Sequence, residues 1–268
     1  MKSVTQPLID VGTLAASLDN FHLFDIRWKL NEPDYGHRAY LDGHLQGAIF
    51  VDLDRDLSAR PDRGRHPLPS PATFAETLGK LGLTPSDDVV VYDDVSGTIA
   101  ARMWWMLQAI GHDRVRLLDG GLGAWIEAGL PVSKTPVAPE PAKYPSPELF
   151  AGVVEMGDLA GRTLLDVRAR ERYEGKTEPV DPKPGHIPGA INVPASEALE
   201  DGTFKEPPRL AALYKQFDQP VVSCGSGVVA CHTALAIAAA GGPVPDLYVG
   251  SYSEWSRSGM PVTTGAKP

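Results

Sequence analysis

The sequence predicts an α/β protein made of two tandem homologous domains, each a mostly parallel sheet flanked by helices. Three observations support this fold class. Motifs of the first half return in the same order in the second half. Short β-branched runs alternate with helical patterns, as in βα units around a buried parallel sheet. Both halves also end with a Trp-containing segment followed by Gly-x-Pro-Val.

The repeat is clearest in two motifs. Residues 23–27 (LFDIR) return as residues 164–168 (LLDVR), and residues 43–49 (GHLQGAI) return as residues 185–191 (GHIPGAI). Self-similarity at this scale indicates a duplicated structural unit. His44 and His186, which occur in both halves, are therefore interpreted as architectural residues.

The βα units follow from local patterns. Val89 to Tyr92 and Val221 to Ser223 are apolar runs of strand length, and residues 99–110 have the pattern of a helix. The Ala-rich residues 228–240 predict a second helix, which ends where Gly241 can adopt the left-handed conformation.

The domain boundaries follow from composition. Residues 136–147 are Pro-rich and without periodicity, which predicts a linker between a domain at 1–135 and a domain at 148–268. His44 precedes Tyr92 by 48 positions, whereas the matching span in the second half is 37. The excess lies around residues 54–70, which are dense in Asp, Arg, Pro and Gly and are predicted to be irregular. Long loops on compact domains are often functional.

Composition excludes several classes of protein. A net charge of −9 over 268 residues argues against a nucleic-acid partner. About 18 uninterrupted apolar residues, the length of a membrane span, do not occur, and the first ten residues lack a signal-peptide pattern. We therefore expect a cytoplasmic protein without a membrane partner. The two cysteines form no disulfide framework, and without a nucleotide-binding loop or metal cluster we expect no cofactor and no metal.

The chemistry is predicted to lie in the turn that contains Cys224. An apolar strand, the turn 224–228 (CGSGV) and a helix follow one another here. A helix N-terminus presents free N–H groups and the positive end of the helix dipole, which together stabilise a thiolate. Gly225 and Gly227 let the backbone curl around one sulfur atom. A buried inert cysteine is the alternative for an isolated residue. The loop and the repeat favour a nucleophile.

These motifs together give the chain a resemblance to the tandem-domain sulfurtransferases of the rhodanese superfamily. CGSGV resembles the loop of the 3-mercaptopyruvate sulfurtransferases, and the match covers nearly the whole chain. The resemblance implies a catalytically silent first domain and a persulfide-forming Cys224 in the second. Asp93 stands where Cys224 stands in the second half, and a carboxylate there would fill the amide cradle without carrying sulfur.

The resemblance also assigns roles to individual residues. It places Asp54 and His66 in a proton relay with Ser226, and it gives Arg168 to the anionic group of the substrate. Arg172 is a second candidate for that clamp. Substrate contacts are expected in the cysteine loop and the start of its helix, at Gly225, Gly227, Val228 and Val229. The chain departs from the family pattern at Val229, where Thr is usual, and at Val180, where an Arg commonly follows Glu-Pro; Lys183 is a possible substitute for that Arg.

The donor is predicted from charge. Thiosulfate-using relatives carry two cations after the cysteine, whereas Gly225 and Ser226 are neutral. The loop therefore favours 3-mercaptopyruvate as the donor, with a thiol such as thioredoxin, a low-molecular-weight thiol or cyanide as acceptor. A thiosulfate:cyanide sulfurtransferase and a non-catalytic persulfide carrier or regulatory module remain alternatives. A cysteine phosphatase is disfavoured because Ala230 and Cys231 stand where it needs an Arg.

Three other residues are interpreted structurally. Cys231 is expected to pack as a small apolar residue, Trp104 to lie in the core, and His232 to lie on a helix surface.

Overall fold

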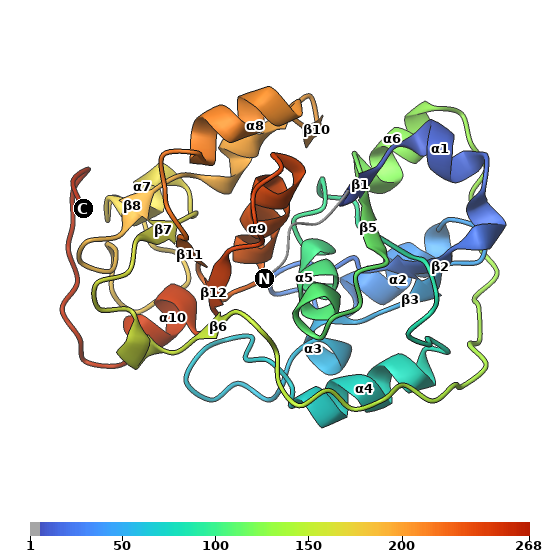
Figure 1. Ribbon diagram of the computed structural model, residues 1–268, viewed down its shortest axis with the longest axis horizontal. Helices are drawn as coiled ribbons and strands as arrows, with labels where there is room; N and C mark the ends of the chain where they lie inside the picture. The colour runs from blue at the N-terminus through green and yellow to red at the C-terminus, as the bar shows by residue number, and fades with distance from the viewer. Residues whose placement is uncertain (1–5) are drawn as a thin grey trace. The chain divides into compact units, whose positions relative to one another are not determined.

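The computed structural model describes residues 6–268, which form two compact units (Figure 1). The N-terminal unit contains residues 6–59 and 69–151, and the C-terminal unit contains residues 60–68 and 152–268. Residues 60–68 thus group with the second half of the chain, whereas the predicted boundaries assign them to the first domain. The predicted linker belongs to the N-terminal unit, where the Ala142 N–H group donates to the Gly79 carbonyl at 2.8 Å.

The N-terminal unit is built on a parallel five-stranded sheet in the order β1-β5-β4-β2-β3. Its strands are β1 (Leu8–Ile9), β2 (His22–Asp25), β3 (Ile49–Phe50), β4 (Val89–Tyr92) and β5 (Val115–Leu118). Its helices are α1 (Val11–Ala15), α2 (Tyr35–Asp42), α3 (Leu53–Asp56), α4 (Pro71–Lys80), α5 (Ala101–Ala109) and α6 (Gly121–Glu127), with a 3₁₀ turn at Leu18–Asn20.

The C-terminal unit repeats this topology, with the parallel order β6-β12-β11-β7-β8. The strands are β6 (Val153–Val154), β7 (Leu164–Asp166), β8 (Ile191–Asn192), β11 (Val221–Ser223) and β12 (Asp246–Tyr248), and β9 (Leu199–Glu200) pairs antiparallel with β10 (Thr203–Phe204). The helices are α7 (Arg170–Tyr173), α8 (Pro207–Tyr214), α9 (Val229–Ala239) and α10 (Ser251–Trp255), with 3₁₀ turns at Met156–Asp158 and Ala195–Ala198. The predicted fold class is confirmed.

Apolar sequence explains the central strands and the helices that follow them. Every residue of β4 and of β11 is buried, as expected for the middle strand of a sheet covered on both faces. All of α5 is buried, including Trp104, which confirms its place in the core. The Ala-rich α9 is buried along almost its whole length, and Gly241 follows it with φ +83°, as predicted for a helix end.

The repeated histidines are architectural in both units, as predicted. His44 stacks on Tyr40 at 3.8 Å and its ring nitrogens face the carbonyls of Tyr40 and Thr135. His186 stacks on Tyr173 at 3.7 Å and faces the carbonyls of Tyr173 and Lys267. Each thereby ties a helix of its unit, α2 or α7, to the segment that follows α6 or α10.

The prediction that residues 54–70 are irregular is correct except at the start of this segment. Helix α3 includes Asp54, because the Asp52 carboxylate caps it by accepting from the N–H groups of Asp54 and Arg55 at 2.9 Å. The remainder, residues 57–70, contains no helix or strand. None of the helices among residues 6–268 is long and apolar enough to cross a membrane.

Candidate active site

Cys224 lies at the carboxyl end of the middle strand β11, directly before the helix α9. Its side chain is buried, and its Sγ accepts the N–H group of Gly227 at 3.2 Å. Gly227 has φ +78°, and a Cβ atom there would collide with the Val249 carbonyl oxygen, so only glycine fits. The loop thus aims a backbone N–H group at the sulfur, beside the positive end of an 11-residue helix.

The short helix α10 holds this loop through hydrogen bonds. The Cys224 N–H group donates to Ser251 Oγ at 3.1 Å, and Ser251 Oγ donates to the Tyr248 carbonyl. The carbonyls of Cys224 and Gly225 accept the N–H groups of Tyr252 and Ser253. Ser251 adopts φ +51°, a left-handed conformation that is unusual for serine. Its hydroxyl therefore joins β12 to the cysteine loop through a locally strained backbone.

The equivalent position of the N-terminal unit holds a carboxylate. Asp93 directly follows β4 and is fully buried, and its two oxygens accept four backbone N–H groups at 2.8–2.9 Å, those of Val95, Gly97, Ile99 and Ala100. Burial raises the pKa of Asp93, while these four donors act in the opposite direction. The carboxylate fills its cradle, as the sequence predicts.

Two of the predicted relay residues are in contact. His66 Nδ1 and Ser226 Oγ share a hydrogen bond of 2.9 Å, which links residues 60–68 to the cysteine loop. The His66 side chain is buried, whereas Ser226 is half-buried. Asp54 belongs to the N-terminal unit, where it accepts the indole N–H group of Trp28 at 2.8 Å. Its partnership with His66 stays a prediction.

Arg168 is held by partners within its own unit, and its role as a substrate ligand stays a prediction. The guanidinium is buried and donates to both oxygens of Asp166, to Glu178 and to the Gly185 carbonyl, while it stacks on the Tyr252 ring at 3.8 Å. Although burial lowers it, the adjacent carboxylates raise the pKa of Arg168 above its usual value.

Arg27 makes two of these contacts in the N-terminal unit. It donates to both oxygens of Asp25 and to the Gly43 carbonyl. The aspartate and carbonyl contacts that recur in both units indicate a structural role for this guanidinium. This geometry argues against Arg168 as a ligand of the substrate.

Arg172 lies closer to the loop and is only partly engaged. Its Nε and Nη2 atoms donate to Glu178 at 3.2 and 2.7 Å, and its side chain is 23% exposed. Burial raises the pKa of Glu178, but Arg172 and the N–H groups of Asp181 and Val180 lower it below its usual value overall. Of the two predicted clamp residues, Arg172 is therefore the one with a partly accessible guanidinium.

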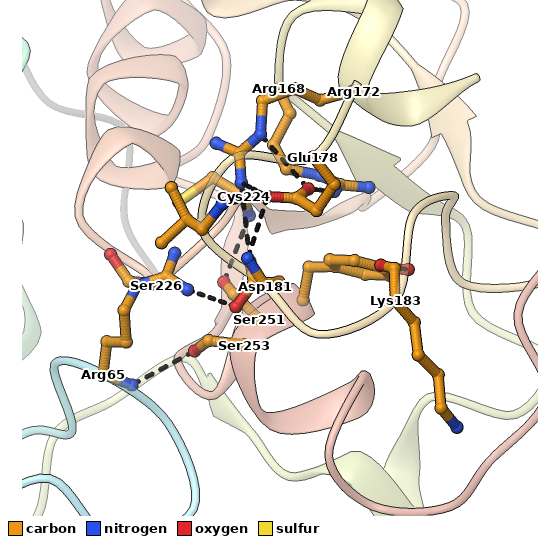
Figure 2. A network of polar contacts seen from close by, with 12 residues as sticks. Arg65, Arg168, Arg172, Glu178, Asp181, Lys183, Cys224, Ser226, Ser251 and Ser253 are labelled. Carbon is orange, nitrogen blue, oxygen red and sulfur yellow. Dashed lines mark hydrogen bonds and ion pairs between the residues drawn. The ribbon is translucent and has the colours of Figure 1, made fainter. Parts of the chain in front are cut away.

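Asp181 connects three guanidiniums, those of Arg65 and Arg172, which Figure 2 labels, and that of Arg257. The carboxylate is buried and accepts from Arg257 at 3.1 Å, from Arg172 at 3.4 Å and from Arg65. Figure 2 shows Arg65 reaching this carboxylate from residues 60–68, while Lys183 points away from the loop. Lys183 is therefore not placed as a substitute for the Arg that the family pattern usually has.

The remaining predicted contact positions lie where the sequence places them. Gly225 and Gly227 form the turn, Val228 stands at the N-cap position of α9, and Val229 is the first residue of α9. The residues 6–268 gather no group of three or more His, Cys, Asp or Glu side chains that could hold a metal ion.

Sequence reasoning missed three residues of this site: Arg65, Asp181 and Ser251. The signal for Arg65 was weak, because it lies in an Arg-rich segment that has no repeat counterpart. Asp181 and Ser251 contact the site through long-range folding alone.

Two expectations for α9 have different outcomes. Cys231 is buried and its thiol donates to the Gly227 carbonyl at 3.3 Å, as expected for a small packed residue. The surface position predicted for His232 is wrong, because its side chain is buried and stacks on Phe204 at 4.5 Å. Phe204 belongs to the hairpin β9–β10, and the local sequence of α9 does not indicate that this hairpin packs over His232.

Comparison with known proteins defines the class. The model of the rhodanese-like domain matches residues 10–128 and again 147–258. A probable 3-mercaptopyruvate sulfurtransferase of Pseudomonas aeruginosa is 41% identical over 96% of this chain and 98% of its own length. A putative thiosulfate sulfurtransferase (SseB) of Mycobacterium tuberculosis is 43% identical over 96% of both chains.

Solved structures of sulfurtransferases share this two-unit fold. The 3-mercaptopyruvate sulfurtransferase of Leishmania major superposes with a TM-score of 0.86 at 29% identity, over 96% of this chain and 75% of its own. The Escherichia coli enzyme SseA, described as a 3-mercaptopyruvate sulfotransferase, gives a TM-score of 0.80 at 30% identity over 92% and 99%. The chain belongs to the rhodanese family. Within that family it is a two-domain sulfurtransferase, as the relatives and the repeated fold together establish.

Proposed function

We propose that this sulfurtransferase takes sulfur from 3-mercaptopyruvate onto Cys224 and passes it to a thiol or to cyanide. The observation that carries the proposal is the hydrogen bond between His66 and Ser226 beside the cysteine loop. A donor whose carbon leaving group must be protonated needs such a relay, whereas the sulfite released from thiosulfate does not.

The first half-reaction is a displacement at sulfur. The Cys224 thiolate attacks the thiol sulfur of 3-mercaptopyruvate, an S–S bond forms and the C–S bond breaks with its electron pair left on carbon. The products are the enzyme persulfide, which retains the donor's thiol proton, and the enolate of pyruvate. The Gly227 N–H group and the N-terminus of α9 stabilise the Cys224 thiolate before the attack.

The enolate carbon then takes a proton. Ser226, two residues after Cys224 in the loop, is proposed to donate this proton, and His66 replaces the proton that Ser226 gives up. Asp54 is proposed to orient His66 and to stabilise its charged form, as in other hydroxyl–imidazole–carboxylate relays. Arg172 holds the substrate carboxylate, with backbone contacts from Gly225, Gly227, Val228 and Val229.

The second half-reaction regenerates the enzyme. A thiolate or cyanide attacks the outer sulfur of the persulfide, forms a bond to it and releases the Cys224 thiolate. The acceptor is proposed to be thioredoxin or a low-molecular-weight thiol in the cell, with cyanide as a convenient laboratory acceptor.

Thiosulfate is a second candidate donor. The putative thiosulfate sulfurtransferase of M. tuberculosis resembles this chain as strongly as the mercaptopyruvate enzymes do, and Arg65 and Arg172 bring positive charge close to the loop. A persulfide carrier without a working donor site would also retain Cys224.

The deciding experiment measures both donors with the same purified protein. Pyruvate formation from 3-mercaptopyruvate and thiocyanate formation from thiosulfate plus cyanide would be compared as kcat/KM values, with Cys224→Ser as the inactive control. A higher value for 3-mercaptopyruvate supports the proposal. A higher value for thiosulfate would replace it, and persulfide transfer from a loaded enzyme without turnover of either donor would favour the carrier.

A further inference from the structure

The Cys224 loop is bordered by a cluster of charges that contains more cations than anions. Four guanidiniums, those of Arg65, Arg168, Arg172 and Arg257, are paired with three carboxylates, those of Asp166, Glu178 and Asp181. The guanidinium of Arg168 donates its hydrogen bonds to Asp166, Glu178 and the Gly185 carbonyl. The excess positive charge of the cluster therefore belongs to the guanidiniums that share Asp181.

Two of those guanidiniums converge on Gly225, the residue next to the nucleophile. A Cβ atom placed on Gly225 would lie 2.7 Å from Arg65 Nη2 and 3.7 Å from Arg172 Nη1. Arg65 is anchored at its other nitrogen, Nη1, by Asp181, and Arg172 is anchored at Nε and Nη2 by Glu178. Both side chains are about one fifth exposed, at 21% and 23%. Each thus has one end fixed and the other directed at the loop.

The backbone of Arg65 is fixed as well. Its N–H group donates to Ser253 Oγ at 3.1 Å, and Ser253 in turn donates to the Gly250 carbonyl within the turn that supports Cys224. An arginine on an irregular segment would ordinarily lose considerable side-chain entropy on binding an anion. Here Asp181 and Ser253 have already removed much of that freedom.

We infer that Arg65 is a donor-binding residue, which together with Arg172 holds the anionic head of the sulfur donor above Gly225, and that Asp181 positions it. The inference rests on the proposed sulfur transfer to Cys224. Oxygen-bearing anions are its targets: the carboxylate of 3-mercaptopyruvate and the sulfonate end of thiosulfate share this chemistry, and paired guanidiniums match both. A Gly at position 225 leaves the space that the Arg65 side chain occupies, so the cation comes from another segment.

The first test removes the charge of the donor and of the enzyme separately. Arg65→Met would be assayed with 3-mercaptopyruvate, with thiosulfate, and with mercaptoacetone, which replaces the carboxylate by a methyl group. We expect kcat/KM to fall about tenfold to a hundredfold for the two anions, the value of a charge-assisted hydrogen bond, and to stay unchanged for mercaptoacetone. An equal fall with all three donors would show a general structural defect and would overturn the inference.

Arg257→Met is the matched control. Arg257 also donates to Asp181, but its side chain is 43% exposed and it is not among the atoms nearest to Gly225. Its loss is expected to change kcat/KM by no more than about threefold, as for other surface substitutions. If both variants lose the same factor, the effect is one of total charge rather than of contact, and Arg65 is not a ligand.

A binding measurement separates this inference from the proposed function. Pyruvate and thiosulfate would be titrated calorimetrically into Cys224→Ser and into Cys224→Ser with Arg65→Met, neither of which turns over. Weaker binding of both anions by the second protein supports the role of Arg65 even if no donor is turned over by the native enzyme. Unchanged binding refutes it even if the native enzyme is active on 3-mercaptopyruvate. Arg65→Lys, which keeps the charge, should restore part of the affinity.

Discussion

Asp93 and Cys224 occupy the same point of the two sheets: each directly follows the middle strand, and each backbone carbonyl accepts an N–H group from the last helical segment of its unit, from Leu122 or from Tyr252. The two side chains differ in what they bind. Asp93 accepts four backbone N–H groups, whereas the Cys224 sulfur accepts the N–H group of Gly227. One duplicated scaffold therefore holds a structural anion in one unit and the proposed reactive anion in the other.

Asp93→Ala is expected to destabilise the N-terminal unit without touching the chemistry. The four N–H groups would lose their acceptor in a buried site, which lowers the free energy of unfolding by about 2–4 kcal/mol. Urea unfolding followed by tryptophan fluorescence measures the change, with the exposed Asp113→Ala as control. A stability equal to that of the control would mean that the cradle is satisfied in another way.

Arg168→Met and Arg27→Met are expected to behave alike in stability. Each removes the guanidinium from a buried carboxylate and leaves it unpaired, which costs about 3–5 kcal/mol of folding free energy. Thermal unfolding of both variants tests the equivalence. A stable Arg168→Met enzyme with only a raised KM for 3-mercaptopyruvate would instead restore Arg168 to the substrate clamp.

Glu178 makes the stability of the C-terminal unit depend on pH in the acidic range. Its pKa is lowered below the ordinary value of 4.5 in the folded protein, despite burial, chiefly by Arg172. The folded protein therefore binds this proton less readily than the unfolded chain, so the contribution of Glu178 is fully present above pH 4.5 and is lost as the pH falls through the folded pKa. Glu178→Gln should be less stable than the native protein at pH 7, and the difference should shrink below pH 4.5. Unfolding measured from pH 7 to pH 3 would show a constant difference if the lowered pKa is incorrect.

Ser226→Ala separates the two donors. Loss of the hydroxyl that meets His66 should lower kcat with 3-mercaptopyruvate about a hundredfold, a typical contribution of a positioned acid. Turnover of thiosulfate should fall much less, because sulfite leaves without a proton. Equal losses would show that Ser226 shapes the loop rather than relays a proton, and iodoacetamide alkylation of Cys224 in the variant would report on that shape.

The repeat made much of the fold predictable. The recurrence of residues 23–27 as 164–168 implied two sheets of one topology, and the strand, glycine turn and helix around Cys224 are visible in local sequence. The pairing of His66 with Ser226 followed only from the family resemblance, since 160 residues separate them.

What escaped prediction depends on contacts distant in sequence. Arg168 follows a strand end as a ligand would, but Glu178 and the Gly185 carbonyl consume its donors, and neither partner is evident from the motif. The burial of His232 depends on Phe204 in a separate hairpin. Residues 60–68 lack periodicity and a repeat counterpart, so their grouping with the C-terminal unit could not be read from the chain.

Because residues 60–68 group with the C-terminal unit, the two halves of the sequence do not coincide with the two structural units. A chain divided anywhere in residues 136–147 would leave Arg65 and His66 on one fragment and Cys224 on the other, although each fragment would contain one complete five-stranded sheet. Neither fragment alone would then hold the residues of the proposed relay. The first half of the chain therefore supplies a segment, residues 60–68, that is part of the structural unit containing Cys224.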